Sequence, residues 1–331
     1  AAAHGDGLQL AAEPAIVLGT ESCKNDPQAI AHVLAALESA GMDRHALVVI
    51  VGGGALQDMV GYAAATTHRG VRVARVPTTV LSQADSGVGV KNGINAFGKK
   101  NFLGSFAPPF AGLIDPNWLS TLPARDAVAG MAEAIKVALI KDPEFFHWIV
   151  AHADALARRE DEAVSHLVQR CAELHLEHIA TGGDPFEYGS ARPLDFGHWA
   201  AHKLESLTAH RLSHGEAVAI GIALDSRYCA EIGMLPAADA ERIVDLIERL
   251  GLPLWDAALE RQGERGLAVL QGLEEFREHL GGELTVTLLE RIGRGREVHE
   301  LDARSIHASL EWLRARSLGP RRPPANLSAT T

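Results

Sequence analysis

Apolar positions in the first third of the chain alternate between short β-branched runs and longer helical periods. Runs at 15–19 (AIVLG), 46–54 and 71–77 predict strands, and the stretches 27–40 and 56–68 predict helices between them. The last run, VRVARVP, is almost continuously apolar, which is typical of a strand buried in a parallel sheet. The alternation predicts an α/β domain built from βαβ units.

The hydrophobic pattern changes near Leu122 and Pro123. Long amphipathic stretches separated by Gly or Pro follow, at 125–141, 143–159, 161–180, 215–232 and 236–250. They predict a mostly helical second domain. We therefore expect an α/β domain over 1–123, a helical domain over 124–317, and a tail over 318–331 that is rich in Pro and small polar residues and frays rather than packs.

Composition narrows the class of protein. The 331 residues suit two domains, and 47% hydrophobic with 22% charged residues is typical of a soluble globular chain. A net charge of −11 argues against a general nucleic-acid binder. The three cysteines have no paired spacing, and no apolar run approaches the ~20 residues that span a bilayer. With no secretory signal pattern at the N-terminus, we expect reduced thiols, no membrane partner and a cytoplasmic location.

A glycine run, Gly52-Gly53-Gly54, follows a predicted strand and precedes a predicted helix. Backbone N–H groups at such a helix N-terminus can hold a pyrophosphate, and glycine lets the phosphates approach closely. A tight strand-to-helix connection explains the same residues equally well. Asp58 can accept a hydrogen bond from a cofactor hydroxyl or favour the positive end of the helix dipole.

The segment 75–101 is too polar and too rich in glycine for a core element. We interpret it as a loop that grips a phosphorylated ligand, although an exposed surface loop has a similar composition. Its cations and amides are Lys91, Lys99, Lys100, Asn92 and Asn101.

Three histidines in the second half indicate a metal site. His198 and His202 lie four apart on one helical face, and His214 follows within a short distance. Glu133 lies in an otherwise apolar helix, where an unpaired charge is costly and a buried partner is expected. Lys136, one turn on, shares its face, so Glu133 is either a metal ligand or half of a structural ion pair.

Seven segments, in this order, resemble the sugar phosphate cyclases, the family of 3-dehydroquinate synthase, 2-deoxy-scyllo-inosose synthase and the valiolone synthases. The resemblance runs from about Glu21 to Arg294. It implies a Rossmann-like NAD-binding α/β domain followed by a helical metal-binding domain, with Zn²⁺ or Co²⁺ as the metal. The segments are GTESCK, GGGALQDMVGYAAATTHRG, RVPTTVLSQADSGVGVK, GKKNFLGSFAPP, LSTLPARDAVAGMAEAIK, DFGHWAAH and LSHGEAVAIG.

The resemblance also implies roles for individual residues. The NAD contacts would be Glu21, Lys24, Gly53, Gly54, Asp58, Thr78, Thr79 and Thr121. The metal ligands would be Glu133, His198 and His214. The catalytic residues would be Asp85, Lys91, Lys136 and His202, with Lys100 and Asn101 binding the substrate. Arg69 matches a residue that reaches the neighbouring subunit's phosphate site, which implies a homodimer.

Departures from the dehydroquinate synthase pattern concentrate where the substrate would be recognised. Residue 175 is His where a carboxylate-binding lysine is expected, and its partner arginine corresponds to Arg192 at a shifted spacing. The pair His175 and His178 by itself is typical of the polar face of a helix. Three further differences are Asp195 for asparagine, Val90 for glycine and Arg294 for a phosphate-binding lysine. The chain also begins without the family's first strand and helix, from which we expect weaker NAD binding.

The resemblance implies cyclisation of a C7 sugar phosphate. NAD would oxidise one alcohol, phosphate would leave by elimination, the same NADH would return the hydride, and an aldol addition would close the ring. Two alternatives remain at this point: an NAD- and metal-dependent polyol dehydrogenase of the iron-containing type, and a non-catalytic paralogue. The dehydrogenase gives no reason for the DSGVGVK and GKKNF segments.

Overall fold

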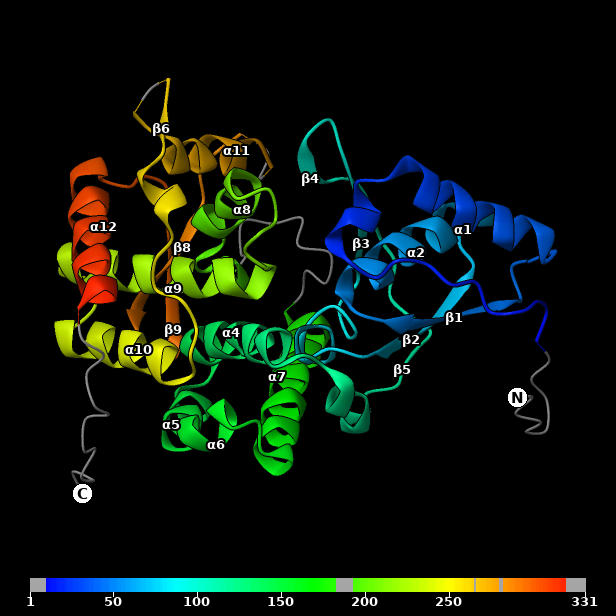
Figure 1. Ribbon diagram of the computed structural model, residues 1–331, viewed down its shortest axis with the longest axis horizontal. Helices are drawn as coiled ribbons and strands as arrows, with labels where there is room; N and C mark the ends of the chain where they lie inside the picture. Colours follow the sequence, from blue (N-terminus) through cyan, green and yellow to red (C-terminus); the bar gives the residue numbers. More distant parts are fainter. Residues whose placement is uncertain (1–9, 183–192, 265, 280–281, 320–331) are drawn as a thin grey trace. The chain divides into compact units, whose positions relative to one another are not determined.

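The computed structural model describes residues 10–182, 193–264, 266–279 and 282–319 (Figure 1). The chain divides into two compact units, Ala1–Trp118 and Leu119–Thr331. Each unit has its own secondary structure and is described by itself. Residues 320–331 of the expected tail, and Arg192, lie outside the described residues.

The first unit contains a parallel three-stranded sheet with the order β1-β2-β5. β1 and β2 pair in register from Leu47 with Arg72 to Gly52 with Pro77, and a helix connects them, so the expected βαβ unit is present. The elements in chain order are η1 (Glu21–Lys24), α1 (Pro27–Ser39), β1 (Leu47–Gly52), α2 (Gly54–Thr66), η2 (Thr67–Arg69), β2 (Arg72–Pro77), α3 (Val80–Ala84), β3 (Lys91–Ala96), β4 (Lys99–Phe106), β5 (Ala111–Gly112) and η3 (Pro116–Thr121), the last of which crosses into the second unit.

The core of the first unit lies where α1 and α2 pack on the sheet. Val33 and Leu37 of α1 meet Ile50 of β1 and Met59 of α2 in one hydrophobic cluster. At the carboxyl ends of the strands, Thr78 N–H donates to the Gly52 carbonyl oxygen at 3.1 Å. The turns after β1 and β2 are therefore held side by side, which is where ligands bind in open parallel sheets.

The expected strand over 15–19 is wrong. The segment has no strand conformation, and Ile16 and Leu18 are 93% and 77% exposed. A β-branched run forms a strand only where a neighbouring strand accepts its backbone hydrogen bonds. Within the described residues, the sheet of the first unit contains β1, β2 and β5.

The interpretation of 75–101 as a loop is also wrong, whereas its role in binding a phosphorylated ligand stays a prediction. The segment holds the end of β2, the short helix α3, and a hairpin in which β3 pairs antiparallel with β4. Its polar residues are compatible with burial because they bond one another: Arg75, 1% exposed, donates to the Ser86 carbonyl at 2.5 Å, and to the amide oxygen of Asn92 at 2.7 Å. The composition of the segment shows that it is polar, but not which of its polar groups form hydrogen bonds with one another.

The second unit is mostly helical, as the sequence predicts. Helix α9 packs against α4, α8, α10 and α12, and thirteen of its residues are buried. The elements are α4 (Ala124–Lys141), α5 (Pro143–Ala151), α6 (Ala153–Ala157), α7 (Asp161–Thr181), η4 (Pro193–Asp195), α8 (His198–Leu207), α9 (His214–Glu231), α10 (Ala237–Arg249), η5 (Ala257–Glu260), β6 (Gln262–Gly263), β7 (Gly266–Leu267), η6 (Ala268–Leu270), α11 (Gln271–His279), β8 (Val286–Arg291), β9 (Arg294–Val298) and α12 (Ala303–Leu318).

One predicted helix of the second unit is divided in the structure. The stretch 143–159 forms two helices rather than one, because His152 leaves the helical conformation between α5 and α6. Within the described ranges, no helix is both long and apolar enough to span a bilayer.

Candidate active site

Helix α4 carries a buried ion pair on its most enclosed turns. Glu133 is 1% exposed and Lys136, one turn later, is 4% exposed. The Lys136 ammonium contacts Glu133 Oε2. The surrounding positions of α4 are Ala, Met, Ile and Val, so the two charges share an apolar environment in which neither would be stable alone.

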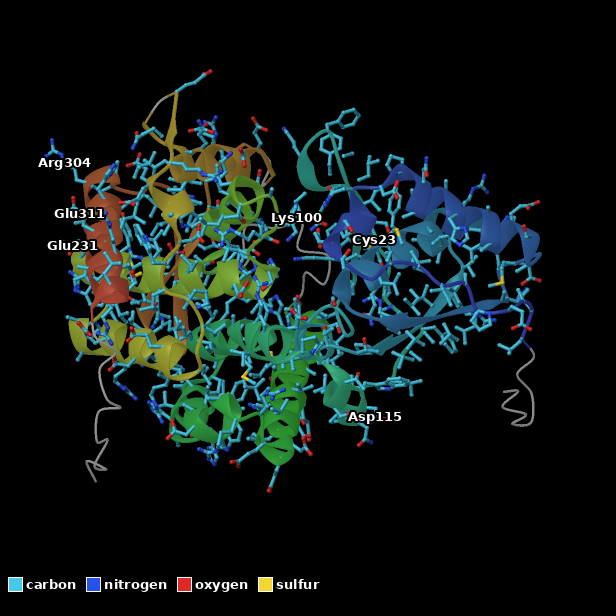
Figure 2. The ribbon with its side chains drawn as sticks, viewed as in Figure 1. Cys23, Lys100, Asp115, Glu231, Arg304 and Glu311 are labelled. Atoms are coloured by element: carbon cyan, nitrogen blue, oxygen red, sulfur yellow. The ribbon has the colours of Figure 1, made fainter. Side chains whose placement is uncertain are left out.

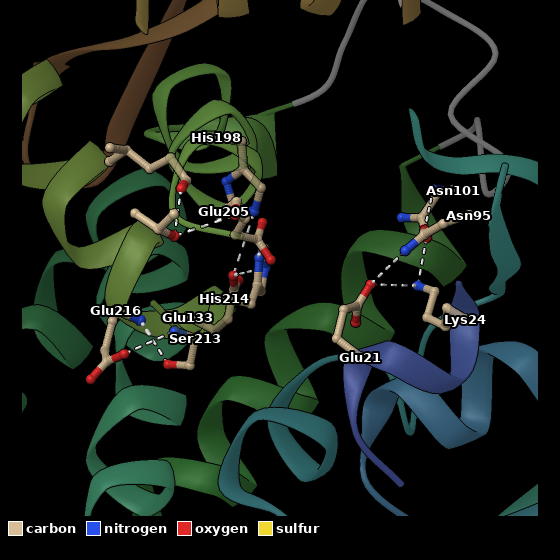
Figure 3. A network of polar contacts seen from close by, with 12 residues as sticks. Glu21, Lys24, Asn95, Asn101, Glu133, His198, Glu205, Ser213, His214 and Glu216 are labelled. Atoms are coloured by element: carbon tan, nitrogen blue, oxygen red, sulfur yellow. Dashed lines mark hydrogen bonds and ion pairs between the residues drawn. The ribbon is translucent and has the colours of Figure 1, made fainter. Parts of the chain in front are cut away.

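Two imidazoles meet the other oxygen of the same carboxylate. His198 Nε2 and His214 Nε2 each lie 3.5 Å from Glu133 Oε1 (Figure 3). His198 begins α8 and His214 begins α9, so three helices supply the three side chains. His202, one turn along α8, has its ring centroid 5.4 Å from that of His198 and 6.0 Å from that of His214.

The start of α9 is fixed by its sequence. Ser213 is the N-cap, and its side chain forms a capping box with Glu216. Glu216 also accepts two hydrogen bonds of 2.7 Å from Arg125 of α4. At Gly215 a Cβ would lie 2.0 Å from the Ala129 carbonyl oxygen, so only glycine lets α9 approach α4 this closely. These contacts bring His214 to Glu133.

The start of α8 is fixed by a buried carboxylate on α9. Asp225 accepts from the backbone N–H of Gly197 at 3.0 Å and from the indole N–H of Trp199 at 2.9 Å, the two residues that flank His198. Gly197 has φ 78°, a left-handed conformation that favours glycine. Burial raises the pKa of Asp225 to about 7, against the opposing effect of the two donors.

The chemistry of these donors fits a divalent cation. Both carboxylate oxygens of Glu133 are buried and, among the described residues, have charged contacts but no well-formed hydrogen bond. Burial raises the pKa of Glu133, but Lys136 and the imidazoles of His198 and His214 outweigh it and hold the pKa well below its usual range. The carboxylate is therefore ionised, as a metal ligand must be.

Glu133, His198 and His214 form one of two groups in the described chain that could hold a metal ion. The other group is His202, Glu205 and His214. One carboxylate with two imidazoles is a donor set typical of catalytic zinc sites, which keep a coordination position open for water or substrate. His198 Nδ1 lies 3.1 Å from the Phe196 carbonyl oxygen, which leaves Nε2 to carry the lone pair.

Three other predicted substrate residues and one predicted NAD contact, Thr121, lie on separate elements. His175 is buried on α7, and Asp195 ends the short helix η4. Arg294 begins β9, is exposed, and pairs with Glu290 at 3.0 Å. Thr121 ends η3 and is exposed. Arg192 lies outside the described residues.

In the first unit, several of the residues predicted to hold NAD bond to one another. Lys24, 3% exposed, donates to Asp58 Oδ2 at 2.7 Å. It also donates to Asn101 Oδ1 at 2.5 Å (Figure 3). Glu21 Oε1 accepts from the side-chain amide of Asn95 at 3.2 Å. The sequence analysis did not anticipate that Lys24 is the partner of Asp58. Lys24 also joins Asp58, a predicted NAD contact, to Asn101, a predicted substrate residue.

The glycine turn lies between β1 and α2, as predicted. A Cβ at Gly53 would lie 3.2 Å from Thr79, and a Cβ at Gly54 would lie 2.9 Å from the Ser86 hydroxyl, so the turn is closely packed. Helix α2 begins at Gly54, and its first N–H groups have no intrahelical acceptor. Thr79 is held by a capping box at the start of α3.

The remaining predicted residues of the first unit lie on the segment between α2 and β4. Asp85 ends α3, Lys91 begins β3, and Lys100 lies on β4. Arg69 is exposed, has φ 65°, and lines a cavity of about 200 Å³. Side chains of the first unit are shown in Figure 2, where Lys100 is labelled.

Sequence reasoning missed three buried charged residues: Glu205, Asp225 and Arg75. Glu205 had a usable signal, since it lies seven residues after His198 on the same helical face. Asp225 lies inside an apolar helical pattern, where a lone carboxylate needs a partner. Arg75 lies within the β-branched run of β2, and its acceptors are mostly backbone carbonyls, which no sequence pattern reveals.

The protein thus has an α/β unit with a parallel sheet, followed by a helical unit with a candidate metal centre. Comparison with protein-family models identifies the family that has this organisation. A family model described as 3-dehydroquinate synthase N-terminal matches residues 15–129, and one described as 3-dehydroquinate synthase C-terminal matches residues 130–271. The chain belongs to the 3-dehydroquinate synthase family.

Two curated relatives and one solved structure show the range of this similarity. The chain is 36% identical over 288 residues to 2-epi-5-epi-valiolone synthase of Streptomyces glaucescens, covering 86% of this chain and 73% of the relative. It is 39% identical over 267 residues to 3-dehydroquinate synthase of Halorhodospira halophila (strain DSM 244 / SL1), covering 80% and 73%. The structure of ValA, a 2-epi-5-epi-valiolone synthase from Streptomyces hygroscopicus subsp. jinggangensis 5008 with NAD⁺ and Zn²⁺ bound, matches with TM-score 0.83 and 33% identity, covering 90% of this chain and 81% of that one.

Proposed function

We propose that this protein is a sugar phosphate cyclase that converts a C7 sugar phosphate to a carbocycle. The reaction is transient oxidation of one alcohol by NAD, elimination of phosphate, re-reduction and intramolecular aldol closure. The observation that carries the proposal is the approach of two imidazoles, each 3.5 Å away, to one oxygen of the buried Glu133 carboxylate. Family membership supports this function over the polyol dehydrogenase and the non-catalytic paralogue.

Glu133, His198 and His214 would hold the cation, which we propose to be Zn²⁺ or Co²⁺. The first unit would be a Rossmann-like NAD-binding domain, with the start of α2 at the pyrophosphate and Thr78 and Thr79 beside it. When bound, the metal supplies Lewis acidity to the substrate's oxygens and the nicotinamide accepts and returns a hydride. The ValA structure, with NAD⁺ and Zn²⁺ bound, supports this assignment.

The protein's own residues would bind and orient the sugar phosphate. Lys136 is held by Glu133 on the apolar face of α4, so its ammonium group is fixed and desolvated, which strengthens its attraction for developing oxygen charge. His202 lies beside the ligand imidazoles and would hold a proton at a substrate hydroxyl. Lys91 and Lys100 would offset charge on the departing phosphate, with Asp85 and Asn101 placing the sugar.

The residues that differ from dehydroquinate synthases concern recognition of a carboxylate on the substrate. His175 is buried on α7, where a lysine would contact a substrate carboxylate. Neutral imidazole binds a carboxylate more weakly than a lysine ammonium does. Two C7 substrates fit the proposal, a heptulosonate 7-phosphate and sedoheptulose 7-phosphate, and the second has no carboxylate. A homodimer completed by Arg69 and a cytoplasmic location remain predictions from the sequence.

The proposed function is tested by incubating the protein with each sugar phosphate, NAD, and Zn²⁺ or Co²⁺. Inorganic phosphate should appear without net accumulation of NADH, since the cofactor is regenerated in each turnover. A matched reaction with a simple polyol should give neither phosphate nor NADH. Accumulation of NADH with the polyol would identify a dehydrogenase instead, and no phosphate from either sugar would contradict the proposal.

A further inference from the structure

Glu205 is a buried carboxylate next to the candidate metal centre, and the function proposed above gives it no role. It lies on α8, one turn beyond His202 and two turns beyond His198, and is 2% exposed. An ionised carboxylate at this depth needs a charged or hydrogen-bonded partner. That partner is an imidazole: His214 Nδ1 lies 3.1 Å from Glu205 Oε2 (Figure 3).

The imidazole of His214 therefore lies between two carboxylates. Its Nδ1 faces Glu205 and its Nε2 faces Glu133 Oε1 at 3.5 Å. In a neutral imidazole one nitrogen donates and the other carries the lone pair. A proton on Nδ1, donated to Glu205, leaves the Nε2 lone pair directed towards Glu133. Glu205 thus selects the tautomer that can bind a cation on the Glu133 side.

The distances favour this arrangement over direct ligation by Glu205. Two ligand atoms about 2.0–2.1 Å from a tetrahedral zinc ion lie about 3.3 Å or more apart, close to the 3.5 Å between Glu133 Oε1 and each Nε2. The 3.1 Å between Glu205 Oε2 and His214 Nδ1 lies in the range of a hydrogen bond. His198 shows the same pattern, with Nδ1 3.1 Å from a backbone carbonyl.

We propose that Glu205 is a positioning residue that fixes the tautomer and orientation of His214 and raises its affinity for the metal. The inference rests on the proposed function, because it assigns the cation to Glu133, His198 and His214. A carboxylate partner increases the electron density on the far nitrogen, whereas the carbonyl partner of His198 orients its ring without a full charge. The two imidazoles would then contribute unequally to binding.

The test measures binding of Zn²⁺ alone, without substrate or NAD, by competition with a chromophoric chelator. Glu205→Gln keeps the shape of the side chain but removes the charge, and we expect about a 10–100-fold weaker zinc affinity. Glu231→Gln is the matched control: it removes one negative charge from the opposite end of α9, where Glu231 pairs with Arg227, and should leave zinc affinity unchanged. Binding of Co²⁺ alone should give an altered visible absorption spectrum only in the Glu205 variant.

Folding is checked by urea unfolding without metal and with excess Zn²⁺. Both variants should unfold cooperatively, and added zinc should raise the unfolding midpoint less for Glu205→Gln than for the wild type. Equal zinc affinities of the Glu205 variant and the wild type would overturn this inference alone. So would loss of all binding in Glu205→Gln with binding retained in Glu133→Gln, because Glu205 would then be a ligand. A wild type that binds no zinc would overturn the proposed function and this inference together.

Discussion

The candidate metal centre of the second unit and the polar network of the first unit organise their charges differently. Around Glu133, three helices direct an ammonium and two imidazoles at one buried carboxylate, whose oxygens make charged contacts but no well-formed hydrogen bond in the described chain. Around Lys24, the ammonium already has two close acceptors, on Asp58 and Asn101. A cation would add to the first arrangement, whereas a ligand that uses Lys24 must share an ammonium group that Asp58 and Asn101 already engage.

This comparison separates two kinds of preorganisation. In the second unit, the ligand atoms are fixed by packing and by hydrogen bonds behind them, so a cation meets a prepared site. In the first unit, Lys24 and Asp58 bond each other in the absence of ligand, so a cofactor would meet side chains that already stabilise the fold. Four changes test the difference, and they are taken in order of decreasing expected effect.

Replacing Glu133 by Gln should cause the largest loss. The amide keeps the shape but removes the anionic ligand and leaves Lys136 without its buried counter-ion. We expect zinc affinity to fall about 1,000-fold, or about 4 kcal/mol, beyond the 10–100-fold typical for partners of metal ligands. Chelator competition with Zn²⁺ measures the loss. The control is Glu274→Gln, which removes an exposed carboxylate paired with Arg277 and should not change affinity. Retained tight binding would show that the cation lies elsewhere.

Replacing Arg75 by Lys tests the first unit. Arg75 donates to the carbonyl oxygens of Ser86 and Gly89 at 2.5 and 2.7 Å, and to Asn92 Oδ1 at 2.7 Å. Lysine has a single nitrogen and cannot reach acceptors on both sides, so buried acceptors lose their donor. We expect a destabilisation of about 3 kcal/mol in urea unfolding.

The control for Arg75 lies on the same strand. Arg72 is exposed at the start of β2, and Arg72→Lys should change the free energy of unfolding by less than about 0.5 kcal/mol. Equal effects of the two substitutions would mean that burial of the guanidinium contributes nothing specific, and the turn that carries Asp85 and Lys91 would need another explanation.

Replacing Gly215 by Ala tests the close approach of α9 and α4. The new Cβ would lie 2.0 Å from the Ala129 carbonyl oxygen, so one helix must move. We expect a loss of about 2 kcal/mol in urea unfolding, with weaker zinc binding because His214 is displaced from Glu133. Gly19→Ala is the control, because a Cβ there meets nothing within 4 Å. An unchanged zinc affinity would show that the site tolerates movement of α9.

The sequence predicted the second unit better than the first for a physical reason. The 3.6-residue period of a helix predicts that Glu133 and Lys136 share one face, and likewise His198 and His202, without knowledge of distant contacts. In the structure the members of each pair lie next to each other. The hairpin of β3 and β4 depends on pairing and on the acceptors of Arg75, which are distant in sequence. The run at 15–19 had strand composition but no strand to pair with in the described chain. The turn that holds His198 depends on Asp225, 27 positions later, which no local pattern reveals.

Replacing Asp225 by Asn should give the smallest effect, and one that depends on pH. Burial raises the pKa of Asp225 to about 7 from the 3.8 of an exposed carboxyl, so the folded protein binds this proton more tightly than the unfolded chain. The stability it contributes is present below pH 3.8 and is lost as pH rises through about 7. Between about pH 6 and about pH 8, the wild type should therefore lose about 1.4 kcal/mol relative to the variant.

Urea unfolding of both proteins across this pH range measures the difference. Trp199→Phe sharpens the test, because its indole N–H lowers the pKa of Asp225, and its removal should move the loss to higher pH. A difference in unfolding free energy that does not change over this pH range would mean that Asp225 keeps one protonation state in the folded protein throughout the range. The pH dependence of metal binding would then not include Asp225.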